Sequence, residues 1–398
     1  MHIPFSPPDI RQEDIDAVVD VLKSGWITSG PVGTQFAQAL TEYCDAAGTV
    51  LVNSCTAGLE LALVALGVGP GDEVIVPAYT YTASASVIHH VGATIVMVDV
   101  APGSYFVDPS TWENAITERT KAIIAVDIAG VMNDTTAIYR AIENRKELFH
   151  PTNSLQEKIG RVALIIDAAH SLGAVRNGAI SGSVADLTAF SFHAVKNLTT
   201  GEGGALCWSK NLPVDHDDFE RTLRILCLHG QDKSALEKMN AAAWEYDILT
   251  PAFKWNLADI MAALGLSQLK RYPEIISRRH EIIDRYDDIL SDTPTTSLMH
   301  VGEDFRSSGH LYLLTLTGYS VAQRNAFIDD MYEAGVSCNV HYKPLPELTA
   351  YQNLGFSSAD YPQALAQYTS EVTLPLHTCL SDEQVEYVAS TARNLILK

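Results

Sequence analysis

Short, almost continuous apolar runs alternate with helical patterns over the first half of the chain, and this alternation constrains the fold more than any other feature. β-Branched residues are abundant in these runs, as in strands that are buried on both faces of a parallel sheet. The runs are Thr49–Asn53, Glu73–Pro77, Thr94–Val100, Lys121–Asp127 and Val162–Asp167, with helical patterns such as Ala57–Leu66 and Asn133–Arg145 between them. The alternation predicts a doubly wound α/β domain with a mixed, mostly parallel sheet.

The pattern changes further along the chain. Two expected strands, Leu187–His193 and Gly204–Trp208, flank a polar, glycine-rich turn. After Phe253 we expect helices Leu257–Leu269 and Glu274–Leu290, strands His310–Leu316 and Val336–Tyr342, and a final helix Asp382–Ile396. This predicts an N-terminal arm and helix over residues 1–30 (with Asp9 or Ser6 as the helix cap), a large α/β domain over residues 31–255, and a smaller C-terminal α+β domain over residues 256–398.

Composition excludes several classes of protein. The 398-residue chain is 47% hydrophobic and carries a formal net charge of -21, so we expect it to bind neither nucleic acid nor anionic membranes. The six cysteines include no CxxC pair, the N-terminus shows no signal-peptide pattern, and no apolar run approaches the roughly 20 residues of a membrane span. We therefore expect a cytoplasmic protein with reduced thiols and no metal site.

A lysine occupies an unusual setting in the segment FSFHAVKNLTTGEGG, residues 190–204. Lys196 follows an apolar strand and precedes the glycine-rich turn. A lone lysine usually lies on an exposed turn, since fully buried lysine is rare. Burial, however, lowers the pKa of an ammonium group, and the neutral amine can then attack an aldehyde. The surrounding segment favours this second interpretation.

An aspartate ends the buried strand in IIDAAH, residues 165–170. A carboxylate there is costly without a cationic partner, and a protonated pyridine nitrogen is such a partner. A helix cap or a metal ligand is the alternative role for Asp167. Because the carboxyl ends of parallel strands meet at one edge of a sheet, we expect Asn53, Pro77 and Asp167 on the same rim.

Two further segments supply polar and aromatic groups to that rim. In NSCTAG, residues 53–58, a strand leads through a turn into a helix, whose free N–H groups suit a phosphate dianion. Ser54 and Thr56 add hydroxyl groups, although a hydroxyl before a helix is more often only a cap. Tyr81, in PAYTYTA, follows the next strand and can stack on a planar ring, although core packing is the commoner fate of a tyrosine.

These segments, in this order, resemble the fold-type I enzymes that depend on pyridoxal phosphate (PLP). More narrowly, the chain resembles the DegT/DnrJ/EryC1/StrS family of sugar aminotransferases over nearly its whole length. The resemblance extends through SGWITSGP, GDEVIVPAYTYTASA, GATIVMVDV, ITERTKAII, KWNLADIMAALGLSQL, VHYKPL and VTLPLHTCLSDEQVEYV. It implies an aminotransferase that moves an amino group from an amino acid, L-glutamate, to a nucleotide-linked keto-sugar in amino-sugar biosynthesis.

The resemblance also implies a role for each matching residue. Lys196 would carry the cofactor as an imine and later move the proton, and Asp167 would pair with the pyridine nitrogen. His170 would approach the ring hydroxyl and Tyr81 would stack on the ring. Asn256 would reach the phosphate from a neighbouring subunit, so a homodimer with shared sites is expected. The remaining matches are the phosphate-binding residues Cys55, Thr56 and Ser191, and two segments near the sugar nucleotide, residues 25–30 and His341-Tyr342.

Three departures from the family pattern and several alternatives remain. Residues 145–161 are longer than the usual link and form either a surface insert or a lid over the substrate. Cys55 replaces a small residue, and Asn256 stands where many members have arginine. A cyclitol or other cyclic ketone as acceptor, or a PLP-binding regulator without activity, is the alternative function. A dehydratase of the same fold is disfavoured because Lys196 is intact, and a nucleotide-binding oxidoreductase because residues 201–204 lack GxGxxG spacing.

Overall fold

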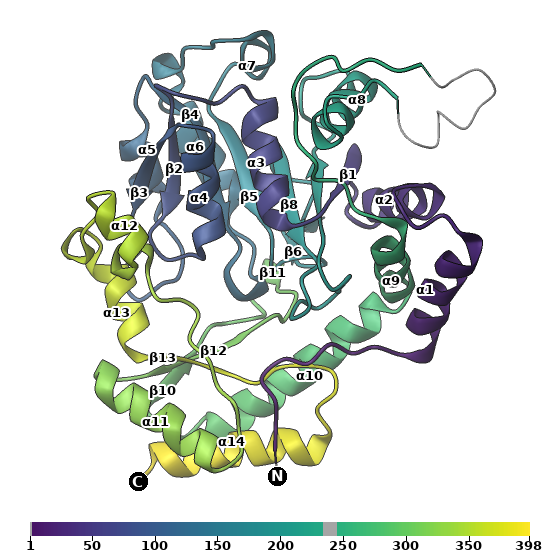
Figure 1. Ribbon diagram of the computed structural model, residues 1–398. Helices are drawn as coiled ribbons and strands as arrows, with labels where there is room; N and C mark the ends of the chain where they lie inside the picture. Colours follow the sequence, from purple (N-terminus) through teal and green to yellow (C-terminus); the bar gives the residue numbers. More distant parts are fainter. Residues whose placement is uncertain (1, 234–244) are drawn as a thin grey trace.

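The computed structural model describes residues 2–233 and 245–398 (Figure 1). A seven-stranded sheet with the order β1-β9-β8-β5-β4-β2-β3 forms its centre. β8, β5, β4, β2 and β3 pair in parallel, whereas β9 pairs antiparallel with both β8 and β1. The strands are β1 (Gly48–Val52), β2 (Glu73–Pro77), β3 (Thr94–Val98), β4 (Thr120–Val126), β5 (Ala163–Asp167), β8 (Leu187–Ser191) and β9 (Gly204–Trp208). The mixed, mostly parallel sheet is the one that the sequence predicts.

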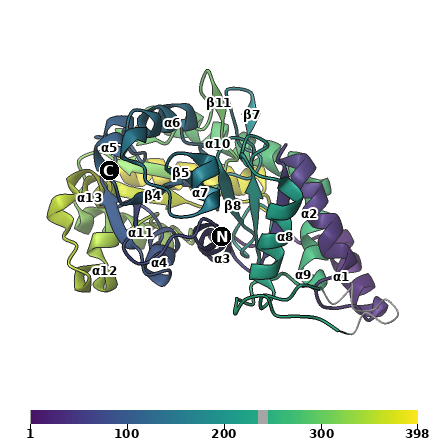
Figure 2. The same ribbon diagram turned by 90° about the horizontal axis from the view of Figure 1, so that it is seen from above.

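Helices cover both faces of this sheet. Figures 1 and 2 show α3 (Cys55–Ala65) and α4 (Thr82–His90) on one face and α5 (Pro109–Ala115) and α6 (Thr135–Glu143) on the other. Every residue of β2, β4 and β5 is buried, which explains why these strands read as continuous apolar runs. The expected doubly wound α/β architecture is therefore confirmed.

The C-terminal part is built on a smaller sheet. β12 (Tyr312–Leu316) pairs antiparallel with β10 (Thr295–Ser297) on one side and with β13 (Glu371–Leu374) on the other. Its helices are α10 (Tyr272–Leu290), α11 (Val321–Glu333), α12 (Thr349–Asn353), α13 (Pro362–Ser370) and α14 (Asp382–Ile396). This part has a hydrophobic core of its own, to which Ile3 of the N-terminal arm also belongs. The domain boundaries after residues 30 and 255 remain predictions.

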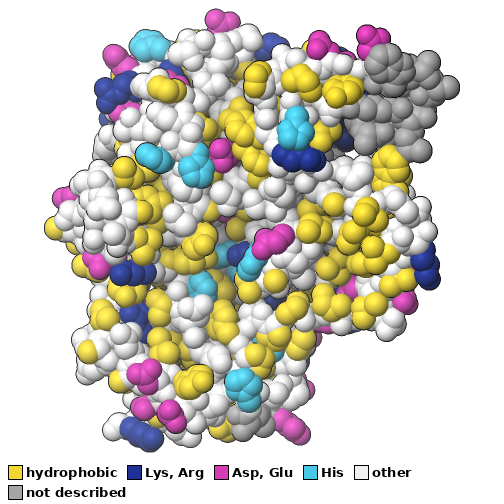
Figure 3. All heavy atoms as spheres, in the orientation of Figure 1, with side chains coloured by type: hydrophobic (Ala, Val, Ile, Leu, Met, Phe, Trp, Pro, Cys, Tyr) yellow, Lys and Arg dark blue, Asp and Glu magenta, His cyan; other side chains and the backbone are white. Residues whose placement is uncertain are grey.

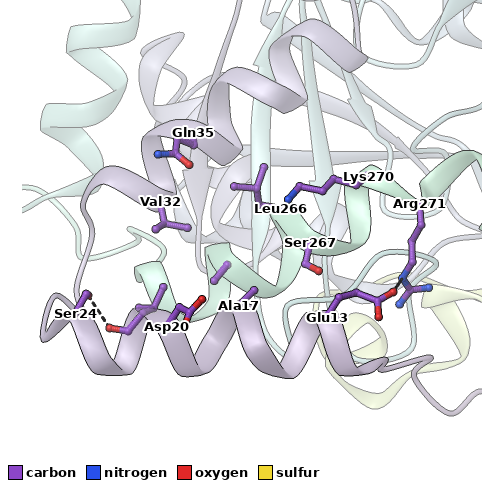
Figure 4. Close-up of a pocket in the computed structure, with 12 residues that line it drawn as sticks. Glu13, Ala17, Asp20, Ser24, Val32, Gln35, Leu266, Ser267, Lys270 and Arg271 are labelled. Carbon is purple, nitrogen blue, oxygen red and sulfur yellow. Dashed lines mark hydrogen bonds and ion pairs between the residues drawn. The ribbon is translucent and has the colours of Figure 1, made fainter.

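The N-terminal helices pack against the start of the C-terminal half. α1 (Gln12–Ser24) and α2 (Pro31–Tyr43) contact α9 (Asp259–Lys270). A cavity of about 460 Å³ is lined by residues of these three helices, and Figure 4 shows their side chains. The buried Arg271 guanidinium, just after α9, donates hydrogen bonds to Asp14 of α1 at 2.8 Å and to Asp9. This ion pair attaches α1 to the body of the molecule.

Shorter elements complete the described chain. α7 (Ser154–Ile159) and α8 (His216–Cys227) are helices of the part of the chain that precedes α9. A small three-stranded sheet joins β6 (Val175–Arg176) to β7 (Ala179–Ile180) and to β11 (Phe305–Arg306). Single turns of 3-10 helix are formed by residues 128–130, 146–148, 345–347 and 358–360. Among residues 2–233 and 245–398, no helix combines the length and apolar character needed to cross a bilayer.

Two expectations about secondary structure are wrong. Residues 336–342 form no strand; they make only isolated bridges, Val336 with Ile3 and Asn339 with Thr373. β13 instead takes the place beside β12, which local sequence cannot reveal. The cap of α1 is Arg11, whose backbone N–H donates to the Asp14 carboxylate at 3.0 Å. Asp9 is engaged by Arg271, and Ser6 donates to the carbonyl of Val195, so neither caps the helix.

The unusual segment 145–161 lies at the end of the sheet away from Asp167. Asn153 and Gln156 each donate a side-chain hydrogen bond at 2.9 Å to the carbonyl of Leu66, the C-cap of α3. Since α3 has 11 residues, this carbonyl lies about 16 Å from the N-terminus of the helix. The segment is a surface insert, and its alternative role as a lid over the predicted site is excluded by this position.

Candidate active site

The predicted site residues meet at the carboxyl edge of the sheet. Asp167 is the last residue of β5, Ser191 ends β8, and Cys55 begins α3 directly after β1. Tyr81 precedes α4, which follows β2. Ligands of doubly wound sheets bind beyond the carboxyl ends of the strands. Figure 3 shows acidic, basic and histidine side chains gathered in a hollow near the middle of one face.

Asp167 is a buried carboxylate held by neutral donors. Ser84 Oγ of α4 donates to Oδ2 at 2.7 Å, and the backbone N–H of Ala169 donates to Oδ1 at 3.1 Å. Cys55 Sγ also donates to Oδ1, at 3.5 Å. None of the ion pairs between described residues includes Asp167, although the residue is only 5% exposed. Its environment therefore suits a cationic group supplied by a ligand.

The first turn of α3 faces the same edge. Ser54 caps the helix by accepting from the backbone N–H of Ala57 at 3.1 Å, and Thr56 is partly exposed beside it. Gly204 of β9 makes room here, since a Cβ at this position would lie only 2.5 Å from the carbonyl carbon of Ser54 and 2.6 Å from the nitrogen of Cys55. The free N–H groups of this turn can bind an anion without a basic side chain.

Cys55 is a packing residue rather than a reactive thiol. Its sulfur donates to the carbonyl of Ala189 at 3.3 Å as well as to Asp167. Burial, and then the negative charge of Asp167, raise the pKa of the Cys55 thiol well above its usual value. The thiol therefore stays protonated, as expected for a small hydrophobic residue.

Lys196 lies in the loop between β8 and β9. Burial lowers the pKa of its ammonium group to about 8, although the negative charges of Asp167 and Cys55 act in the opposite direction. More of the amine is therefore neutral near neutral pH than in an exposed lysine, and this neutral form can attack a carbonyl carbon. The electrostatic coupling to Asp167 also shows that the amine and the carboxylate share one site.

His170 is a neutral ring whose tautomer the structure defines. Burial lowers its pKa well below the usual value, and the charges of Lys196 and His341 lower it further. Its Nδ1 accepts from the backbone N–H of Ala129 at 3.2 Å, so the proton of the neutral ring is on Nε2. Nε2 then donates to the hydroxyl of Tyr342 at 3.1 Å.

Two other predicted residues border this group without entering it. The ring of Tyr81 is 59% exposed, and its centroid is 5.9 Å from that of Tyr342. Ser191 Oγ accepts from the backbone N–H of His193 at 3.3 Å. The structure thus brings Lys196, Asp167, Cys55 and His170 together and places Tyr81 and Ser191 at their edge.

Asn256 lies apart from this group within the same chain. Its backbone forms an isolated bridge with Val52, its amide donates to Ser29 Oγ, and its carbonyl oxygen accepts from Lys254. With Ser29 it lines a second cavity of about 820 Å³ that borders α2, β1 and α8. No hydrogen bond between described residues links its side chain to Lys196 or Asp167.

Sequence reasoning missed Ser84 and Tyr342 as partners of the predicted residues. Ser84 belongs to ASA in the first turns of α4 and gives no signal by itself, since its role depends on α4 lying beside the end of β5. Tyr342 is part of a segment expected near a substrate, but its bond to His170 spans 172 residues. Local patterns cannot predict such long-range pairs.

Comparisons with known proteins show which family the chain belongs to. It matches the DegT/DnrJ/EryC1/StrS aminotransferase family over residues 8–393. It is 36% identical over 400 residues to the spore coat polysaccharide biosynthesis protein SpsC of Bacillus subtilis, covering 99% of this chain and 97% of the relative.

Two solved structures extend the comparison. Spr1654 of Streptococcus pneumoniae, described as a sugar aminotransferase and solved in PLP and PMP forms, is 48% identical with a TM-score of 0.96. The match covers 100% of this chain and 98% of the PMP-form chain. Helicobacter pylori PseC, an aminotransferase of pseudoaminic acid biosynthesis, is 28% identical with a TM-score of 0.87, and each chain is fully covered.

The fold and this site define a PLP-dependent aminotransferase of fold type I. The chain belongs to the DegT/DnrJ/EryC1/StrS aminotransferase family, whose structural neighbours are sugar aminotransferases. The residues present fit the cofactor. Asp167 is buried and takes part in none of the ion pairs between described residues. Lys196 is a partly neutral amine, and the turn at Ser54 offers free N–H groups next to Gly204.

Proposed function

We propose that the enzyme transfers an amino group from L-glutamate to a keto-sugar linked to a nucleoside diphosphate, in the biosynthesis of an amino sugar. The observation that carries this proposal is the electrostatic coupling of the partly buried Lys196 to the buried Asp167. A relative named for spore coat polysaccharide biosynthesis and a neighbour described as a sugar aminotransferase support a sugar as the acceptor. We propose the cytoplasm as the compartment.

Each predicted residue then has a task. Bound PLP supplies an electron sink that stabilises negative charge on the substrate carbon. Lys196 would hold the cofactor through its amine and, once released, move the proton at that carbon. Asp167, oriented by Ser84, would keep the ring nitrogen protonated. His170 would orient the ring hydroxyl, and Tyr81 would cover the ring.

The remaining residues would hold the phosphate. Cys55 and Thr56 present the N–H groups of the first turn of α3, and Ser191 adds a hydroxyl from the end of β8. We propose that Asn256 completes this site in the partner subunit of a homodimer. The position of its side chain outside its own chain's site supports this assignment.

The two half-reactions test the proposal separately. PLP-loaded protein mixed with L-glutamate should release 2-oxoglutarate and lose the visible absorbance of the lysine-bound cofactor. Keto-sugar nucleotides added to that product should restore the absorbance, and the acceptor that does so fastest identifies the sugar. Protein with Lys196→Ala should do neither, and turnover by this variant would refute the assignment of Lys196.

A further inference from the structure

A buried glutamate lies next to the site in the C-terminal part. Glu371 is the first residue of β13 and is fully buried, yet none of the ion pairs between described residues includes it. Its Oε2 accepts from the backbone N–H of His341 at 2.8 Å, and its Oε1 is 2.5 Å from the hydroxyl of Thr373. A buried carboxyl group with neutral partners favours its protonated form.

The hydroxyl of Thr373 links this carboxyl group to an imidazole. Thr373 Oγ1 lies 2.9 Å from Nδ1 of His341, so Glu371, Thr373 and His341 form one chain of hydrogen bonds. Thr373 is itself fully buried. No hydrogen bond between described residues reaches Nε2 of His341, which leaves this nitrogen for a ligand.

His341 belongs to the active site. Burial, and then the charge of Lys196, lower the pKa of its ring to about 3, so the ring is neutral near neutral pH. His341 is also electrostatically coupled to His170 and His310: it lowers the pKa values of both rings, after the larger effects of burial and of other charged groups. The ring of Phe5 stacks on the ring of His341 with centroids 5.6 Å apart.

The single hydroxyl hydrogen of Thr373 couples the protonation state of Glu371 to the position of the proton on the His341 ring. If Glu371 is ionised, Thr373 donates to it and accepts from Nδ1–H of His341, so that Nε2 carries a lone pair. If Glu371 is protonated, it donates to Thr373, whose hydroxyl then donates to Nδ1. The proton of the neutral imidazole is in this second case on Nε2.

The groups around Glu371 favour the protonated form. Burial raises the pKa of the carboxyl group to about 8, while the bonds from Thr373 and His341 and the charge of Arg324 on α11 oppose this shift. Arg324 donates to the backbone carbonyl of Glu371 rather than to its carboxyl group. The other titratable groups coupled to Glu371 carry no positive charge: Tyr79, Tyr105, Tyr342 and Cys338.

We propose that Glu371 is a positioning residue that acts through Thr373 to keep the proton of His341 on Nε2, from which His341 donates a hydrogen bond to an oxygen of the bound substrate. The recipient is a carboxylate of the amino donor or a hydroxyl of the keto-sugar. Only this choice of substrate rests on the proposed function, since the relay itself consists of protein groups.

Nitrogen NMR on the full-length enzyme tests the relay without substrate. In protein with ¹⁵N-labelled histidine, assigned with a His341→Gln variant, His341 should be in the Nε2–H form at pH 7. As the pH rises through about 8, the proton should move to Nδ1. An Nδ1–H ring at pH 7, or a tautomer that does not respond to this pH range, would overturn the proposal.

Variants separate the relay from general damage to the fold. Glu371→Gln should keep the Nε2–H form at all pH values, because its amide donates to Thr373 as the protonated acid does. Thr373→Val should abolish the pH response, and Thr373→Ser should restore it. Thr315→Val is the matched control: Thr315 pairs with Glu371 in the β12–β13 register but bonds to Tyr105, and its loss should leave His341 unchanged.

Steady-state kinetics then identify the recipient oxygen. Thr373→Val should raise the KM of one substrate about tenfold, as expected for a lost hydrogen bond, with a smaller change in kcat. A higher KM for the amino acid indicates its carboxylate, and a higher KM for the keto-sugar indicates a hydroxyl. If the tautomer shifts but neither KM changes, His341 does not contact substrate. A failure of the proposed function would instead abolish turnover in every variant and leave the NMR result intact.

Discussion

Burial gives Lys196 the chemistry of a free amine. Its pKa of about 8 is well below that of an exposed lysine because desolvation disfavours the ammonium form. In cofactor-free enzyme, only the neutral amine can combine with the aldehyde of PLP. The rate of cofactor attachment, followed by visible absorbance, should therefore rise with pH, with its midpoint near pH 8, and level off at higher pH. A midpoint near that of an exposed lysine would contradict the proposed burial.

Ser84 gives a second prediction for a single residue. It donates to Asp167 at 2.7 Å, and a hydrogen bond to a charged group contributes about 1.5–3 kcal/mol. Ser84→Ala should therefore weaken PLP binding roughly tenfold or more, as measured by titration of cofactor-free protein. Ser86→Ala is the control, since Ser86 lies on the same helix and bonds only to a carbonyl of its own turn. Equal affinities for the two variants would show that Ser84 does not orient the carboxylate.

The sequence predicted the central residues of the site because they stand at recognisable strand ends. Asp167 ends β5, while Cys55 and Lys196 lie in the segments that follow β1 and β8, and each of these strands is marked in the sequence by a short run rich in apolar residues. Ser84 and Glu371 were missed because their roles depend on elements brought together by the fold. Glu371 in particular reads as an ordinary polar residue before VTLPL, and only its burial beside His341 reveals it.

At the scale of elements, the ion pairs of Arg271 with Asp14 and Asp9 attach helix α1 to the residues that follow α9. The pKa of Asp14 is kept low because its bonds from Arg11, Ser267 and Arg271 outweigh the effect of burial. Removing one partner of such a buried pair costs about 3–5 kcal/mol, since the other charge stays buried. Arg271→Ala should lower the free energy of unfolding by about this amount in denaturant titrations at neutral pH.

The contribution of the Asp14–Arg271 ion pair to the free energy of unfolding should depend on pH. The carboxylate of Asp14 has a lowered pKa, so its contribution is present at neutral pH and is lost as the pH falls through that value. The difference between Arg271→Ala and the parent protein should shrink accordingly in acid. Arg285→Ala removes an exposed ion pair with Glu386 and should cost less than about 1 kcal/mol. A similar cost for both variants would refute the special role of Arg271.

The elements that the sequence predicted well are those with a strong local signal. β2 and β9 have the predicted bounds, and α14 does also, because apolar periodicity and caps mark them. The expected strand over residues 336–342 was wrong, since β13 is the strand that pairs with β12 on that side. Both segments mix apolar and polar residues, so their local sequences do not show which of them pairs with β12.

At the scale of the whole molecule, the proposed contribution of Asn256 from a partner requires a dimer. Several large apolar side chains are exposed on and near the N-terminal helices, among them Ile15, Leu22, Ile27 and Met261. Burying such side chains favours association. In sedimentation velocity, the active enzyme should migrate as two chains. An active species with the 43.3 kDa mass of one chain would contradict the shared site.

The central claim is that the amine of Lys196 carries the cofactor, and chemical trapping tests it most directly. PLP-loaded enzyme would be reduced with borohydride, digested, and its peptides examined by mass spectrometry. We expect the added mass of the reduced cofactor on the peptide that contains Lys196 and on no other lysine. Attachment to a different lysine, or no attached cofactor after loading, would contradict the account.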